Sequence, residues 1–197
     1  LPQMDRFRVN VHTQRGSVEA AFRRVPLVIP DIDSLGLPGI IPDLARKPNG
    51  LVLVTGPTGV GKTTTLASMI DLINNERECI LIAIEDPIEF VFRPKSSIIS
   101  QREMGADSLS WQVALRSVLR EDPDVVMVGE MRDYETVSAA LTIAETGHLV
   151  FATLHTNSAA QTIDRIVDVF PDEQQKQVRL QLSNVIEAVF SMRLVPS

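Results

Sequence analysis

The sequence contains little cysteine, few aromatic residues and no long apolar run. Its one cysteine, Cys79, has no partner for an intrachain disulfide, and no pair of CxxC half-sites is present to bind zinc; this is typical of a reducing compartment. No apolar stretch approaches the roughly 18 residues that a membrane span needs. These absences predict a soluble, cytoplasmic chain without a membrane span of its own.

The charge balance is acidic, with 25 Asp and Glu residues against 19 Lys and Arg, and there is one Trp and one Tyr. Surfaces that bind nucleic acid usually combine a basic patch with stacking aromatic rings, so we expect no nucleic acid as a partner. Apolar residues make up 44% of the 197 residues and are spread along the chain, which argues against disorder. The length fits one ordinary domain with room for a small appendage.

The N-terminal region has the pattern of a β-hairpin. Apolar residues alternate over residues 7–11 and again over residues 18–22, with a Gly-containing turn at residues 14–17. A lone hairpin is marginally stable, so we expect it to belong to a larger sheet, and Pro26 and Pro30 predict an extended linker after it. We expect a chain cut from a longer protein at both ends, consisting of the end of an N-terminal domain (1–26), a linker and entry segment (27–48) and a main domain (49–197).

After residue 48, short apolar runs alternate with longer amphipathic segments. The apolar runs predict strands at Leu51–Val54, Ile80–Ile84, Val125–Val128 and Leu149–Leu154. The amphipathic segments predict helices at Lys62–Asn74, Ser110–Arg120, Tyr134–Glu145, Ser158–Val169 and Asp172–Met192. An additional hairpin is expected at the sheet margin between Ile88 and Ile99. Apolar strands separated by helices indicate an α/β nucleotide-binding fold with a mostly parallel sheet covered on both faces.

The strongest motif lies directly after the first of these strands and opens a helix. The segment Gly56-Pro57-Thr58-Gly59-Val60-Gly61-Lys62-Thr63 fits the pattern G-x-x-x-x-G-K-[ST]. Such a loop wraps a phosphate chain with its backbone N–H groups, while the lysine reaches the outer phosphates and the threonine hydroxyl binds Mg²⁺. The predicted nucleotide-binding residues are Gly56, Pro57, Thr58, Gly59, Val60, Gly61, Lys62, Thr63 and Thr64. The alternative is a Gly-rich turn before an ordinary helix.

Polar residues follow three of the predicted strands at their C-terminal ends, where open α/β sheets bind ligands. Glu85 follows the second strand and Glu130 the third, with Gly129 where an Asp is usual. We predict that Glu130 polarises the attacking water and binds Mg²⁺ through water, together with Thr63, and that Glu85 assists as an acid near the metal. The alternative for Glu130 is an acid that is stabilised by the dipole of the helix that follows it. The alternative for Glu85 is a place beside an Asp-Pro turn at Asp86.

Two of the three histidines, His148 and His155, lie at opposite ends of the predicted strand 149–154. His155 follows the C-terminal end and is placed to sense the outermost phosphate. His148 is expected to support packing or a neighbouring contact. Their separation disfavours a zinc site built from both.

These segments, in this order, resemble the secretion ATPases that drive type IV pili and type II secretion. The resemblance rests on the Walker A motif at 56–63, the Asp box at 84–90, the Walker B motif at 128–133, the His box around 148–155 and the segment 160–171. It covers nearly the whole chain and is strongest to the pilus retraction branch. The extension and type II relatives carry a four-cysteine module after the His box, whereas the lone Cys79 lies before it, which favours retraction.

The resemblance implies a RecA-like P-loop NTPase core preceded by the end of a PAS-like N-terminal domain. It also implies ATP and Mg²⁺ as cofactors, a ring-shaped homo-hexamer at the inner membrane, and a membrane platform protein and the pilus machinery as partners. By the same likeness, Arg8 and Arg23 match arginines that reach nucleotide phosphates as the domains close; the alternative is two solvated arginines on exposed strand positions.

The leading hypothesis is therefore an ATP-hydrolysing hexameric motor that retracts type IV pili for twitching motility by disassembling the pilus. A pilus extension or type II secretion ATPase of the same family is the nearest alternative. A RecA-like nucleic-acid translocase shares the core and the ring, and a nucleotide-binding regulatory module with a vestigial ATPase is a third possibility.

Overall fold

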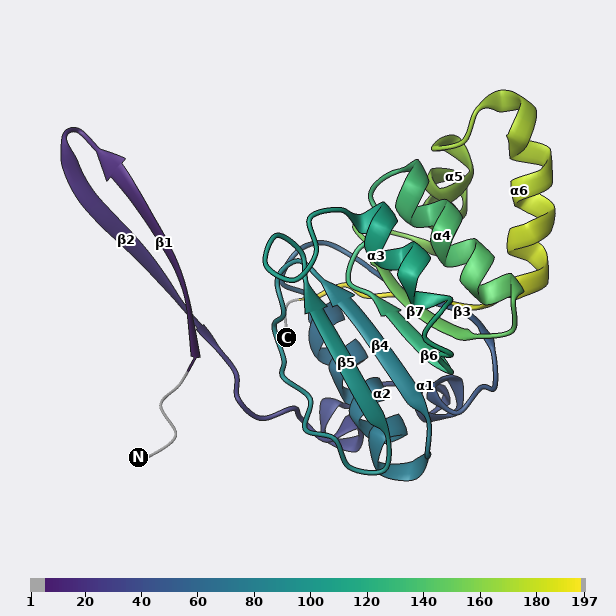
Figure 1. Ribbon diagram of the computed structural model, residues 1–197, viewed down its shortest axis with the longest axis horizontal. Helices are drawn as coiled ribbons and strands as arrows, with labels where there is room; N and C mark the ends of the chain where they lie inside the picture. The colour runs from purple at the N-terminus through teal and green to yellow at the C-terminus, as the bar shows by residue number, and fades with distance from the viewer. Residues whose placement is uncertain (1–5, 196–197) are drawn as a thin grey trace.

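The structure is a computed structural model that describes residues 6–195, and it contains a two-stranded and a six-stranded sheet (Figure 1). Strands β1 (Arg6–Gln14) and β2 (Ser17–Val25) pair antiparallel along their whole length. Arg15 and Gly16 join them with positive φ angles of 47° and 82°, the conformation of a tight hairpin turn. The predicted hairpin is thus confirmed, and Figure 1 shows it projecting from the main body.

The six-stranded sheet has the order β5-β4-β6-β7-β3-β8, and every pairing in it is parallel. Its strands are β3 (Gly50–Thr55), β4 (Ile80–Glu85), β5 (Ile98–Glu103), β6 (Val125–Val128), β7 (Leu149–Leu154) and β8 (Ile186–Ser191). All residues of β3, β6 and β7 are buried, as expected for parallel strands covered on both faces. This confirms the predicted α/β fold, and it aligns the carboxyl ends of the strands along one edge.

The remaining elements cover the two faces of the sheet. They are the 3₁₀ helix η1 (Ile32–Leu35) and the helices α1 (Ile40–Ala45), α2 (Lys62–Glu76), α3 (Trp111–Val118), α4 (Tyr134–Glu145), α5 (Ala159–Asp168) and α6 (Asp172–Val185). One core cluster joins α3 to α6 with one set of alternating strand residues, and the other joins η1, α1 and α2 with the opposite set. Leu53 and Val54 illustrate the alternation, because these neighbours on β3 belong to different clusters.

The hairpin predicted between Ile88 and Ile99 is wrong. Residues 88–97 form no strand, and β5 begins only at Ile98 and runs parallel to β4. In this segment, side chains form the hydrogen bonds to the backbone that a neighbouring strand would otherwise have formed. Asn74 binds the backbone of Arg93 and Lys95, and Gln101 binds that of Phe90 and Phe92.

The helix predicted over Asp172–Met192 is too long. Helix α6 ends at Val185, and the chain continues as β8, which pairs with β3. Pairing with the open edge of β3 outweighs the helical pattern of the sequence, because strand formation depends on tertiary context.

The stretch predicted as a linker, residues 27–48, also contains structure. It holds η1 and α1, and Ile32, Ile41 and Leu44 are buried in the same cluster as α2. Within residues 6–195, no helix is both long and apolar enough to cross a bilayer.

Candidate active site

The loop between β3 and α2 is shaped by glycines. Gly56 and Gly61 have φ angles of 140° and 102°, which residues other than glycine rarely adopt. A Cβ on Gly56 would lie 2.4 Å from the carbonyl oxygen of Met192, just after β8. The Lys62 ammonium donates to the carbonyl oxygens of Gly56 (2.8 Å) and Pro57 (3.1 Å). The loop therefore holds a buried positive charge at the N-terminus of α2, where phosphates bind.

A cleft of about 280 Å³ lies between this loop and the carboxyl ends of β4, β6 and β7. The predicted site residues that line it are Thr58, Gly59, Gly61, Lys62, Thr63, Thr64, Glu85, Glu130, His155 and Arg23. The structure thus brings together the loop, both predicted acids and the predicted histidine. Val60 is buried instead, and Gly56, Pro57 and Arg8 do not line the cleft.

Lys62, His155 and Glu130 form a connected chain across the cleft. The Lys62 ammonium lies 3.4 Å from Nδ1 of His155, and Nε2 of His155 lies 3.1 Å from Oε1 of Glu130. Lysine can only donate, so Nδ1 accepts and the imidazole proton sits on Nε2, from which it donates to the carboxylate. Burial lowers the pKa of the Lys62 ammonium, while the charges of Glu130 and Glu89 oppose that shift.

The second oxygen of Glu130 contacts Arg132, with 2.6 Å between Nη2 and Oε2. Burial favours the neutral form of the Glu130 carboxyl, but the hydrogen bond and charge of Arg132, together with the hydrogen bond from His155, prevail and lower its pKa below the usual range. The carboxylate is therefore ionised at neutral pH and held from two sides.

Gly129 stands where an Asp is usual, and the packing explains why a side chain is disfavoured there. A Cβ on Gly129 would lie 3.1 Å from both Cα of Glu85 and the carbonyl oxygen of Ile84. The Gly129 N–H donates to that same Ile84 oxygen at 2.8 Å, and its own carbonyl accepts from the Thr153 hydroxyl. The end of β6 is thus clamped between β4 and β7.

Glu85, the last residue of β4, is a buried acid, with a relative exposure of 3%. Burial raises its pKa to about 7, although the amide of Gln101 on β5 donates to Oε1 at 3.0 Å and favours the ionised form. At neutral pH this carboxyl is therefore partly protonated beside the cleft, whereas Glu130 is ionised.

The pKa of Glu85 predicts a pH dependence of stability. The folded state keeps a proton that the unfolded state loses between pH 4.5 and about 7, so the free energy of unfolding should fall as pH rises through this window. The wild type should lose about 3 kcal/mol relative to Glu85→Gln across it. Urea unfolding of both full-length proteins at about pH 5 and about pH 8 measures this difference. Exposed Glu78→Gln is the control, and an equal pH dependence in wild type and Glu85→Gln would contradict the prediction.

His148 lies at the opposite end of β7 from the cleft. Its Nδ1 lies 2.9 Å from the carbonyl oxygen of Ile143 and 3.0 Å from the hydroxyl of Thr146, at the end of α4. These contacts tie the end of α4 to the start of β7. They agree with the neighbouring contact predicted for His148.

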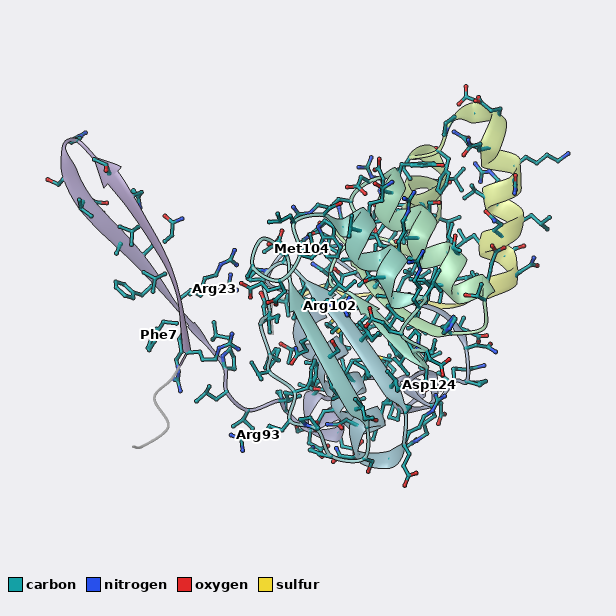
Figure 2. The ribbon with its side chains drawn as sticks, in the orientation of Figure 1. Phe7, Arg23, Arg93, Arg102, Met104 and Asp124 are labelled. Carbon is teal, nitrogen blue, oxygen red and sulfur yellow. The ribbon has the colours of Figure 1, made fainter. Side chains whose placement is uncertain are left out.

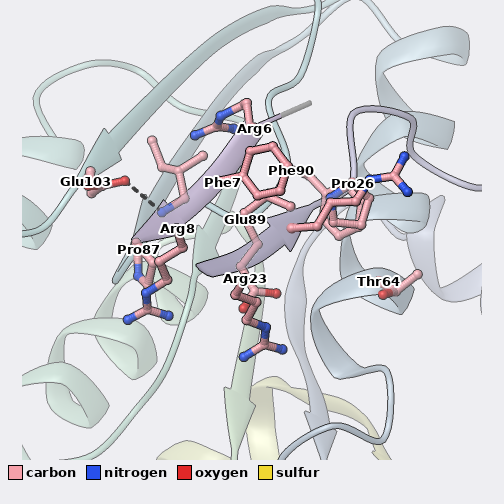
Figure 3. Close-up of a pocket in the computed structure, with 13 residues that line it drawn as sticks. Arg6, Phe7, Arg8, Arg23, Pro26, Thr64, Pro87, Glu89, Phe90 and Glu103 are labelled. Atoms are coloured by element: carbon pink, nitrogen blue, oxygen red, sulfur yellow. Dashed lines mark hydrogen bonds between the residues drawn. The ribbon is translucent and has the colours of Figure 1, made fainter. Parts of the chain in front are cut away.

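Of the two hairpin arginines, Arg23 lines the cleft and Arg8 does not. Arg23 lines the cleft, and Figure 2 shows it pointing from β2 toward the main body. Arg8 lines an adjoining pocket of about 380 Å³, to which Arg23, Thr64 and Glu89 also contribute. Figure 3 shows the two guanidinium groups on the same side of the hairpin.

The chain is similar to known proteins over most of its length. The family described as "Type II/IV secretion system protein" matches residues 39–197. The chain belongs to this family. Type II/IV secretion system proteins similar to it include the "Type IV pilus retractation ATPase PilT" of Pseudomonas aeruginosa, 52% identical over 99% of this chain and 57% of the relative. The "Twitching motility protein" of Neisseria gonorrhoeae is 53% identical over 99% of this chain and 52% of the relative.

A solved structure of this family has the same architecture. The crystal structure of "the Pilus Retraction Motor PilT and Bound ADP" superposes with a TM-score of 0.95 and 58% identity, covering 100% of this chain and 57% of that one. The P-loop ATPase fold of the type II/IV secretion system proteins is therefore present here. The chain spans only about half the length of the curated relatives it matches.

Three contacts of the site were missed by the sequence reasoning. Arg132 follows Glu130 by two residues, and its opposite charge was a signal that could have been used. The contact of Gln101 with Glu85 follows from the pairing of β5 with β4, and the approach of Met192 to Gly56 follows from β8. Neither strand was predicted, so no sequence signal pointed to these two contacts.

Proposed function

We propose that the full-length protein is an ATP-hydrolysing motor that powers type IV pilus retraction, and with it twitching motility, by disassembling the pilus. The observation that carries the proposal is the chain from Lys62 through His155 to Glu130 in the cleft, in a chain 52% identical to a type IV pilus retractation ATPase. The motor is a homo-hexamer in the cytoplasm, peripheral to the inner membrane. Its partners are a membrane platform protein and the pilus machinery.

The residues of the cleft fit ATP with Mg²⁺. The backbone of the loop and Lys62 would hold the phosphates, and the Thr63 hydroxyl at the start of α2 would be a protein ligand of Mg²⁺, with Glu130 binding it through water. Within the described residues, no group of three or more His, Cys, Asp or Glu side chains is placed to hold a metal. Mg²⁺ bound to phosphates takes few protein ligands, so this site needs no such group.

The chain's own residues divide the chemistry of hydrolysis. Glu130 is ionised and can orient and polarise an attacking water. The Lys62 ammonium lowers the negative charge felt at the phosphates, and bound Mg²⁺ would add to this effect. His155 couples Glu130 to Lys62, so a change at the phosphates reaches both sides of the cleft. Glu85 lies at the next strand end and assists as the acid of the pair with the higher pKa.

The hairpin completes the site when the domains close. In this proposal residues 1–26 are the end of a PAS-like domain, residues 27–48 connect it, and residues 49–197 belong to the RecA-like ATPase domain. Arg23, at the cleft, and Arg8, beside it, then contact nucleotide phosphates during closure.

Arg23→Ala tests the role of the hairpin. In the full-length protein we expect turnover to fall about tenfold, because one charge-assisted contact to the phosphates is lost, while MgATP affinity changes by no more than about twofold. Phosphate release and isothermal titration measure the two quantities. If the purified variant hydrolyses ATP like wild type, Arg23 has no part in turnover.

A phosphate-release assay with and without DNA separates the motor from a nucleic-acid translocase. We expect the full-length protein to hydrolyse ATP at a rate that DNA leaves unchanged, in keeping with the acidic composition. Stimulation by DNA that weakens with added salt would favour a translocase. Absence of ATP hydrolysis would favour a regulatory module.

A further inference from the structure

Arg132 contacts the carboxylate of Glu130 but does not line the cleft. A small cavity of about 20 Å³ is lined by Asp86, Trp111, Glu130, Arg132, Asp133 and Thr136. Glu130 borders both this cavity and the cleft, whereas Arg132 borders the small cavity and not the cleft. Arg132 therefore reaches the site through Glu130 and not through contact with the cleft itself.

The contact between Arg132 and Glu130 is short, and the two side chains differ strongly in solvent exposure. Nη2 of Arg132 lies 2.6 Å from Oε2 of Glu130, while the Arg132 side chain is 66% exposed and the Glu130 side chain 19%. An ion pair between two exposed side chains does little to restrict the conformation of either one. Here, however, Glu130 is largely buried, and its other oxygen already accepts a hydrogen bond from His155. Two donors on opposite oxygens fix the rotation of the carboxylate plane.

The backbone of Arg132 is anchored, so the guanidinium starts from a fixed point. The Met131 N–H donates to the carbonyl oxygen of Thr153 on β7 at 3.0 Å. The Arg132 N–H lies 3.3 Å from the Thr136 hydroxyl, and Asp133 caps α4 through a capping box with the same threonine. Glu130 and Arg132 are thus held on either side of a residue tied to the sheet, directly before a capped helix.

We infer that Arg132 is a positioning residue that fixes the orientation of Glu130, so that the free lone pairs of the carboxylate face the cleft. This inference rests on the proposed function, because it assigns to Arg132 an effect on ATP turnover. Arg132 contributes through the geometry of Glu130, whose hydrogen bond and charge raise the pKa of the guanidinium, and the charges of Asp86 and Asp133 add to this more weakly. The effect should appear in kcat and not in nucleotide binding.

The test compares Arg132→Gln, Arg132→Lys and Arg179→Gln in the full-length protein. We expect Arg132→Gln to lower kcat about tenfold while KM and the Kd for MgATP stay within about twofold of wild type. Arg132→Lys should recover part of the lost kcat, because it restores a cation beside Oε2. Arg179, exposed on α6 away from the cleft, provides the matched loss of charge and should leave kcat unchanged.

A double variant separates positioning from a general structural effect. In the Glu130→Gln background, adding Arg132→Gln should cause no further loss of turnover, because the carboxylate that Arg132 positions is gone. A further loss there, a kcat for Arg132→Gln within about twofold of wild type, or a raised KM with normal kcat would each overturn the inference. If wild type itself hydrolyses no ATP, the proposed function fails. If wild type hydrolyses ATP and the Arg132 variants have the same kcat, this inference alone fails.

Discussion

Glu130→Gln in the full-length protein should lower ATP turnover by about 10³-fold and leave the Kd for MgATP within about twofold of wild type. Glutamine keeps the shape of the side chain, and its one carbonyl oxygen can still accept a hydrogen bond from Arg132 or from His155. It removes the negative charge that polarises the attacking water. Phosphate release measures the turnover, and isothermal titration measures the binding.

Glu173→Gln is the matched control for this variant, since Glu173 is exposed in the first turn of α6 and does not line the cleft. Its turnover should equal that of wild type. Normal turnover in Glu130→Gln would remove Glu130 from the reaction. Lost binding together with lost turnover would instead mean that the carboxylate mainly holds the nucleotide with Mg²⁺.

Lys62→Ala should weaken MgATP binding by about 10²-fold and abolish turnover at moderate ATP concentrations. The ammonium is buried in the loop, donates to two loop carbonyls and lies beside His155. Its removal takes away the positive charge nearest the phosphates and one end of the chain to Glu130. Titration with MgATP in the full-length protein measures the change in affinity.

Lys176→Ala on the exposed surface of α6 is the control for the loss of one lysine charge. It should bind MgATP as wild type does. Thermal melting without nucleotide checks that Lys62→Ala remains folded. Wild-type affinity in a folded Lys62→Ala protein would show that the loop is not the phosphate site.

The parts of the site that the sequence predicted are those encoded locally. A glycine-rich loop has a sequence pattern that predicts its own backbone shape. Helix α4 begins and ends at the predicted Tyr134 and Glu145, because its apolar period lies within the segment and its N-cap, Asp133, directly precedes it. Residues at the ends of parallel strands must meet at one edge of the sheet. The proximity of Glu85, Glu130 and His155 therefore followed from order along the chain.

The parts that were missed depend on partners distant in sequence. Residues 88–97 have strand-like composition, but Asn74 and Gln101 supply the hydrogen bonds that a neighbouring strand would have supplied. Residues 186–191 form a strand because β3 offers an open edge, which the helical pattern before Val185 does not reveal. The raised pKa of Glu85 likewise arises from burial created by the whole sheet.

Replacing the chromosomal gene with one encoding Glu130→Gln, and then counting pili and scoring surface motility, tests the central claim most directly. The account predicts immotile cells with more pili than wild type, since pili would still extend but would no longer be withdrawn. The strain with the Glu173→Gln control should resemble wild type in both respects. Immotile cells without pili would contradict the account and identify an extension motor.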